Sequence, residues 1–175
     1  KPNQNVEETP PSDESIMPKP DSRPTPIELD DLPGHHIRSL HQIAVAIFLQ
    51  ETEPTGLTPV QYAVLQTVSN TPGLDQRTLA GAVGQDTSTI GGVVDRLEAR
   101  GLLQRNASSD DRRVRLLTLT HAGHDLLGSA IPGMLRAQER MLHPLPKRER
   151  AEFMRMLRAL VNANNELSRA PSEGG

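Results

Sequence analysis

Between residues 57 and 119 the spacing of the apolar residues changes from that of helices to that of strands, and this order constrains the fold most. Three short helical segments are predicted first, at 59–70, 76–83 and 87–100. Thr58, Asp75 and Asp86 (or Thr87) precede them, and these residue types cap helix N-termini. Thr58 is followed three residues later by Gln61, which predicts a capping box. Gly101 is placed to end the third helix.

A strand pattern follows the third helix. Residues 102–105 and 114–119 predict two short strands, and the polar residues 106–111 between them predict a turn. Three short helices followed by a two-stranded hairpin form a winged helix-turn-helix, so residues 57–120 are predicted to be such a DNA-binding domain in a mainly α protein. The segment 87–100 would be the recognition helix, which enters the major groove of DNA.

The expected DNA contacts come from the recognition helix and the hairpin turn. Hydroxyl groups at the start of a helix in a groove reach base edges or phosphates. A guanidinium at a projecting turn can enter a minor groove, although a solvated turn with a surface ion pair is the alternative. Gly91 and Gly92 leave two explanations open, close approach to DNA and close packing against another helix. The candidate DNA-binding residues are Thr87, Ser88, Thr89, Gly92, Arg96, Asp111, Arg112 and Arg113.

The segments that flank this domain predict helices with more apolar surface than a three-helix domain can cover. They span 35–52, 121–142 (with a kink expected at Pro132 and Gly133) and about 147–168. Pairing of two chains would bury these apolar faces. We therefore expect 34–56 and 121–168 to form a helical dimerisation region; a monomer with these helices folded over its core is the alternative.

Both ends of the chain differ from the rest in composition. Residues 1–33 hold eight of the 15 prolines and carry a net charge of −5, whereas residues 34–175 carry +2. Because so few apolar groups cannot offset the entropy of ordering, 1–33 and 169–175 are predicted to be disordered tails. An acidic arm that binds a partner or mimics DNA is the alternative for 1–33.

The composition also excludes several classes of protein. The chain has no cysteine, which excludes disulfides, thiolate catalysis and thiol-based peroxide sensing. It shows neither an apolar run long enough to cross a membrane nor a signal sequence, so the expected location is the cytoplasm. No phosphate-binding glycine loop, nucleophile elbow or metal-binding helix motif is present, so we predict that it is no enzyme and needs no cofactor.

Three blocks of the sequence resemble MarR-type transcriptional regulators. They are LTPVQYAVL at 57–65, DRLEARGL at 95–102 and the hairpin signature DRRVRLLTLTHAG at 111–123. The resemblance extends from residue 35 to about 168. It implies a homodimer on a pseudo-palindromic DNA site, with Arg113 in a minor groove and Asp111 positioning it. Gly92 stands where some members have an arginine, so base recognition would depend more on hydroxyl groups and DNA shape.

The resemblance also implies a small effector, bound between the dimer helices and the winged domain. The segments 40–50, 57–68 and 73–103 are particularly similar to repressors of aromatic-acid catabolism, among them the group that controls nicotinate degradation and responds to 6-hydroxynicotinate. A small aromatic carboxylate is therefore the expected effector. Arginine and histidine can pair with a carboxylate, and tyrosine supplies a ring and a hydroxyl. The candidate effector-binding residues are Arg38, His41, Tyr62, Asp75 and Gln76.

Other interpretations stay open for these groups and for the protein. Arg38 and His41 could instead be solvent-exposed, and Tyr62 a core residue. A winged helix that binds protein and a zinc-responsive regulator of the same fold are the alternative functions. The zinc alternative would use histidines among 35, 36, 41, 121, 124 and 143.

Overall fold

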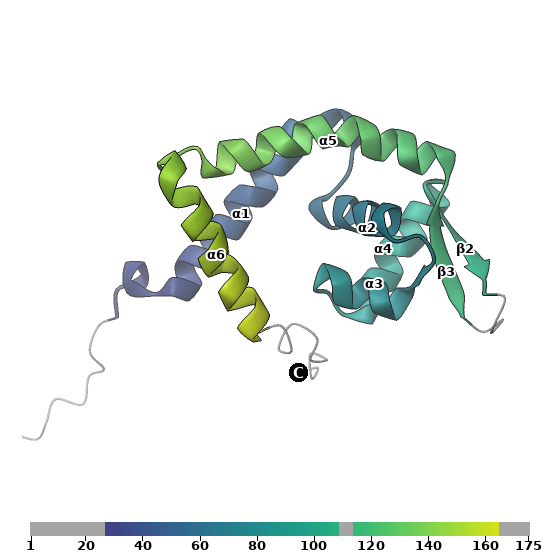
Figure 1. The fold of residues 1–175 in the computed structure, drawn as a ribbon, viewed down its shortest axis with the longest axis horizontal. Helices are drawn as coiled ribbons and strands as arrows, with labels where there is room; N and C mark the ends of the chain where they lie inside the picture. Colours follow the sequence, from purple (N-terminus) through teal and green to yellow (C-terminus); the bar gives the residue numbers. More distant parts are fainter. Residues whose placement is uncertain (1–26, 109–113, 165–175) are drawn as a thin grey trace, which may run out of the picture.

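The computed structural model describes residues 27–108 and 114–164. The elements are α1 (Pro33–Glu51), α2 (Pro59–Asn70), β1 (Leu74–Asp75), α3 (Gln76–Val83), α4 (Thr87–Ala99), β2 (Leu103–Ala107), β3 (Arg115–Leu119), α5 (His121–Leu142) and α6 (Lys147–Asn164), with 3-10 turns at Leu29–Asp31 and Glu53–Thr55. Helix α5 runs along the top of Figure 1 and joins two parts of the molecule. One is the winged part, formed by α2, α3, α4 and the hairpin of β2 and β3, and the other consists of α1 and α6.

The three short helices begin at the predicted caps. The Thr58 hydroxyl accepts a hydrogen bond from Gln61 N (3.2 Å), and Gln61 Oε1 accepts one from Thr58 N (3.1 Å), which completes the capping box. The side chain of Asp75 caps α3 by accepting from Thr78 N, and that of Asp86 caps α4 by accepting from Thr89 N. Gly101 has a φ of +69° just after α4, a conformation that favours glycine. These features confirm the helix-turn-helix expected from the sequence.

The sheet has three antiparallel strands in the order β1-β3-β2, one more than predicted. Strand β1 has two residues and is therefore too short to show an alternating pattern. The predicted turn at 106–111 also began too early. Asn106 belongs to β2, where it faces Leu116, and its side-chain amide donates to Thr118 Oγ1 at 2.9 Å. This cross-strand bond keeps a typical turn residue in the ladder.

The core of the winged part lies between α2, α3, α4 and the sheet. Its fully buried side chains are aliphatic and come from each of these elements: Leu65, Val68, Leu79, Ile90, Val94, Leu97, Leu103 and Leu117. Helix α5 adds Leu127 and Ala130 to the same cluster. Burial of these groups is the main stabilising contribution to the domain, at about 25 cal/mol per Å² of apolar surface.

Two glycines let α5 approach both parts of the molecule closely. A Cβ atom at Gly123 would lie 2.0 Å from the carbonyl oxygen of Leu102, just before β2. A Cβ atom at Gly133 would lie 2.3 Å from the carbonyl oxygen of Glu51, at the end of α1. Beside this crossing, Arg136 Nε donates to Glu51 Oε2 at 3.0 Å. Helix α5 is therefore fastened to the winged part at one end and to α1 near its middle.

Two boundaries outside the winged part differ from the sequence expectation. Helix α1 begins at Pro33, two residues before the predicted start, because proline suits the first turn of a helix. The 3-10 turn at Leu29–Asp31 precedes it, within the segment that composition assigned to the tail. Helix α5 is assigned as one element that contains Pro132, and the kink expected there stays a prediction.

Candidate nucleic-acid interface

The N-terminus of α4 opens into a hollow of about 1150 Å³ on the surface between α3 and α4. Thr87, Ser88 and Thr89 line it and are all exposed. The Thr89 hydroxyl donates to Asp86 Oδ2 at 2.5 Å, and this bond and the Thr89 N–H lower the pKa of Asp86. The hydroxyls of Thr87 and Ser88 have no partner among the described residues, so they are free to bind a ligand that enters the hollow.

A stripe of residues continues along the outer face of α4 from this hollow. Thr89, Gly92 and Arg96 are spaced three and four apart and therefore share one side of the helix. A Cβ atom at Gly92 would lie 3.4 Å from Arg96 Nη1, so the guanidinium lies over the glycine. Arg96 is exposed and has no acidic partner in the part of the chain that the structure describes. The stripe thus presents the Thr89 hydroxyl, which is bonded to Asp86, and one positive charge without an acidic partner among the described residues.

The two neighbouring glycines have different surroundings. A Cβ atom at Gly91 would lie 3.0 Å from Gln76 Nε2 on α3, closer than nearly all real contacts of this kind. Gly91 therefore leaves room on α4 for the Gln76 side chain of α3, which favours the packing explanation left open by the sequence. Gly92 faces Arg96 and the outer surface, where another molecule could approach.

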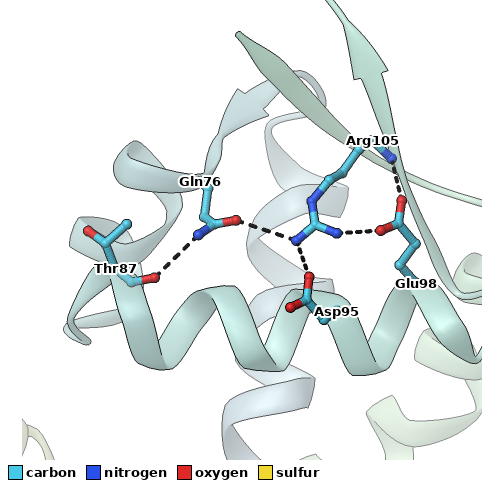
Figure 2. Close-up of polar contacts among 5 residues, drawn as sticks. All are labelled: Gln76, Thr87, Asp95, Glu98 and Arg105. Atoms are coloured by element: carbon cyan, nitrogen blue, oxygen red, sulfur yellow. Dashed lines mark hydrogen bonds and ion pairs between the residues drawn. The ribbon is translucent and has the colours of Figure 1, made fainter. Parts of the chain in front are cut away.

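Arg105 on β2 links three elements of the winged part, namely β2 itself, α3 and α4 (Figure 2). Its guanidinium forms ion pairs with Asp95 and Glu98 of α4. Its Nη2 also donates to Gln76 Oε1 on α3 at 3.5 Å, and Gln76 Nε2 donates to the Thr87 carbonyl at 3.3 Å. We call Gln76, Asp95, Glu98 and Arg105 the Arg105 cluster.

The Arg105 cluster was missed as a functional group in the sequence. The sequence feature that could have revealed it is the alternation of buried and exposed side chains along β2. Leu103 is buried, and Arg105, two residues later, points to the same face of the sheet. An arginine on a core-facing side needs acidic partners, and Asp95 and Glu98 lie three apart on the preceding helix.

The predicted hairpin contacts, Asp111, Arg112 and Arg113, lie outside the described residues. The strands that flank them are β2, which ends at Ala107, and β3, which begins at Arg115. In Figure 1 this hairpin projects away from the helices of the winged part. The roles of the three residues remain predictions.

The structure places the five candidate effector residues in different surroundings. Tyr62 is buried, packs edge-on against Phe48 with ring centres 5.8 Å apart, and donates its hydroxyl to Gln66 Oε1 at 3.0 Å. Burial raises the pKa of Tyr62. Asp75 caps α3, and bonds from Thr78 lower its pKa, whereas Gln76 belongs to the Arg105 cluster.

Arg38 and His41, the other two candidates, are exposed on α1. No hydrogen bond or ion pair within residues 27–108 and 114–164 joins any two of the five candidates. A shared effector site therefore stays a prediction.

Two further properties of the described residues bear on the nature of the site. They contain no group of three or more histidine or acidic residues arranged to hold a metal ion. None of their helices is both long enough and apolar enough to span a bilayer.

Comparison with known proteins agrees with this geometry. Residues 57–114, which span α2 to the hairpin, match the model of the MarR family. The transcriptional repressor NicR of Pseudomonas putida is 32% identical over 140 residues, which cover 80% of this chain and 89% of NicR.

Solved structures extend the likeness to the whole fold. PcaV of Streptomyces coelicolor in complex with its natural ligand is 36% identical with a TM-score of 0.75, covering 79% of this chain and 98% of PcaV. BpsR of Bordetella bronchiseptica, whose DNA binding is regulated by 6-hydroxynicotinic acid, is 30% identical with a TM-score of 0.74, covering 78% of this chain and 97% of BpsR. The chain therefore belongs to the MarR family of winged helix-turn-helix transcriptional regulators.

Proposed function

We propose that this protein is a transcriptional repressor that binds a pseudo-palindromic operator as a homodimer and leaves it when a small aromatic acid binds. The observation that carries the proposal is the exposed face of α4, where the free hydroxyls of Thr87 and Ser88 at the N-terminus and the unpaired Arg96 guanidinium lie on the same helix beside the hairpin strands. The family and the repressor NicR support the class of function.

The α4 stripe suits the major groove of DNA. Helix α4 would enter with its N-terminus first, so that Thr87, Ser88 and Thr89 meet base edges or phosphates. Arg96 would follow two turns later and bind a phosphate or a guanine edge. Gly92 leaves space between them for the DNA backbone, and Arg112 and Arg113 of the hairpin would contact the neighbouring minor groove.

A homodimer accounts for the apolar faces outside the winged part. Ile43 on α1 is 53% exposed, and Leu160 and Val161 on α6 are 55% and 63% exposed. No described residue of α6 is buried in the single chain. Burial of these faces against a second copy removes apolar surface from water and gives the twofold symmetry of a palindromic operator.

The proposed effector is a small aromatic carboxylate, with 6-hydroxynicotinate as the first candidate. BpsR, whose DNA binding is regulated by 6-hydroxynicotinic acid, supports this class of ligand, and PcaV in complex with its natural ligand supports the binding of a ligand by this fold. In this chain the exposed Arg38 guanidinium offers a cationic donor for a carboxylate, and the exposed His41 ring offers a further hydrogen-bond donor. Zinc, the alternative effector, would bind histidines and would make the response sensitive to a chelator.

The proposed mechanism of release is a change in the spacing of the two α4 helices. Binding to successive major grooves needs recognition helices about 34 Å apart. An effector held between α1 and the winged part would change this spacing through α5, which is fastened to both. A coupling free energy of about 1–3 kcal/mol between effector and DNA is sufficient for release at cellular concentrations.

The test combines selection of DNA with a screen of aromatic acids. Duplexes selected from a random library on the purified chain should yield a palindromic site, and 6-hydroxynicotinate should raise the melting temperature and weaken binding to that site. The variant Arg38→Gln, in which only the cationic donor changes, should keep DNA binding and lose the response. Failure to select any duplex contradicts the DNA-binding proposal, and a screen in which no acid changes both measurements contradicts the effector proposal.

A further inference from the structure

We propose that Arg105 is the positioning residue that sets the angle of α4 relative to the hairpin, and that Asp95 and Glu98 strengthen DNA binding through it although they carry the charge of DNA. The inference rests on the proposed DNA-binding function. It concerns the side chains that fix the position of α4 relative to the hairpin, the two elements proposed to contact DNA.

Arg105 links β2 to the C-terminal part of α4. Arg105 Nη2 lies 2.5 Å from Asp95 Oδ1, and Nη1 pairs with Glu98 Oε2. The backbone N–H of Arg105 donates to the other oxygen of Glu98 at 3.2 Å. Because Asp95 and Glu98 are three residues apart, they lie on the side of α4 that faces the hairpin. Both the strand backbone and its guanidinium thus hold nearly a full turn of the helix.

A second link leads to the first residue of α4. Gln76 opens α3 and accepts from Arg105 through Oε1, while its Nε2 donates to the Thr87 carbonyl. Figure 2 shows this chain of contacts running from Arg105 to the N-terminus of α4. Gly91 leaves the space that the Gln76 amide occupies. One guanidinium therefore contacts the C-terminal part of α4 directly and the start of α4 through Gln76.

The Arg105 cluster carries a net negative charge. It holds two carboxylates and one guanidinium, so its net charge is −1, and the Asp95 side chain is 67% exposed. The Arg105 side chain is 22% exposed, and both of its terminal nitrogens already have protein partners. The Arg105 guanidinium is therefore used in bonds within the protein, and we do not expect it to contact a phosphate.

Because the Arg105 cluster has a net negative charge, electrostatic repulsion and positioning predict opposite changes in DNA affinity when Asp95 loses its charge. If electrostatics alone mattered, Asp95→Asn would remove a negative charge close to the phosphates and strengthen DNA binding. If the carboxylate positions α4 through Arg105, the same variant weakens binding. A lysine at 105 keeps the positive charge but lacks the planar fork that joins Asp95, Glu98 and Gln76.

The experiment compares affinities for the selected duplex over a range of salt concentrations. Asp95→Asn and Arg105→Lys should each weaken binding by about tenfold, and together by less than the product, since they break the same contact. The slope of log affinity against log salt should stay as in the wild type. The control is Asp125→Asn, which removes one exposed acid of α5 outside the Arg105 cluster and should leave the affinity unchanged or slightly higher.

Folding is checked by the melting temperature and the size of each variant. If Asp95→Asn proves unstable, Gln76→Leu replaces it: this variant keeps both ion pairs, removes the bonds of Gln76 to Arg105 and to the Thr87 carbonyl, and should weaken binding by a smaller factor than Arg105→Lys. Binding of Asp95→Asn as tight as that of Asp125→Asn, or a slope reduced by about one in Arg105→Lys, would overturn the inference. If the wild type selects no duplex, it is the proposed function that fails.

Discussion

At the scale of single residues, Thr120 connects the end of α4 to the start of α5. Its hydroxyl accepts from Gly123 N at 3.0 Å and donates to the Gly101 carbonyl at 2.6 Å. Thr120→Ala removes the helix cap and leaves two backbone groups without this partner, so the free energy of unfolding should fall by about 1–2 kcal/mol. Urea unfolding measures this loss. Thr120→Ser keeps the hydroxyl and should retain most of the stability; equal losses in both variants would show that the bonds contribute nothing.

The two aspartates that cap α3 and α4 should make the free energy of unfolding depend on pH. Bonds from the Thr78 and Thr89 hydroxyls, followed by backbone N–H groups, hold the pKa values of Asp75 and Asp86 below the ordinary value of 3.8. A carboxyl whose pKa is lower in the folded state stabilises above its unfolded pKa and loses this contribution as pH falls through the folded pKa. Stability should therefore decline as the pH is lowered below about 4.

The matched control replaces both carboxyls with amides. Asparagine caps helices about as well as aspartate but does not titrate in this range. The double variant Asp75→Asn with Asp86→Asn should thus lose less stability than the wild type between pH 5 and pH 2.5, as measured by thermal unfolding. An identical decline in both proteins would assign the acid sensitivity to other carboxyls.

At the scale of elements, two glycines of α5 should respond to alanine in opposite ways. Gly128 has open space around its Cβ position, so Gly128→Ala should stabilise the helix by up to about 1 kcal/mol. The Cβ atom of Gly133→Ala would lie 2.3 Å from the Glu51 carbonyl oxygen, and backbone must move to accept it. This variant should lower the melting temperature. Two stabilised variants would mean that α1 and α5 do not cross as closely as the structure shows.

The elements were largely predictable because their signals are local. Thr58, Asp75 and Asp86 lie next to the helices they cap, and Gly101 lies next to the helix it ends. Strand β1 escaped prediction because its pairing partners, Leu116 and Leu117, are about forty residues away and decide its conformation. Asn106 was assigned to a turn by its residue type, while its place in β2 depends on pairing with β3.

The candidate site was predictable only where one element carries it. Thr87, Ser88 and Thr89 follow from the position of the recognition helix in the chain. The Arg105 cluster needs α3, α4 and β2 to meet, and Gln76 was assigned to an effector site because its sequence neighbours do not reveal Arg105. Tyr62 faces the core, as in the alternative that the sequence left open.

At the scale of the whole molecule, the proposed dimer makes DNA binding dependent on α6. Its apolar side chains Met156, Leu160 and Val161 are exposed in the single chain. Leu160→Glu would place a charge in the proposed interface, where its desolvation is unfavourable. The variant should therefore be monomeric at concentrations where the wild type sediments as a dimer. Asn162→Glu adds the same charge on the opposite side of α6 and should leave the dimer intact.

Loss of the dimer should also abolish tight operator binding, although α4 and the hairpin are untouched. In a dimer the second half-site is bound by a domain already held nearby, which raises the overall affinity by about 10²–10⁴-fold over a single domain. Leu160→Glu should lose a factor of this order on a palindromic duplex and little on a duplex with one half-site, as measured by gel shift. A Leu160→Glu monomer that binds the palindrome as tightly as the wild type would show that each winged domain acts alone, and the apolar faces of α1 and α6 would then need a different partner.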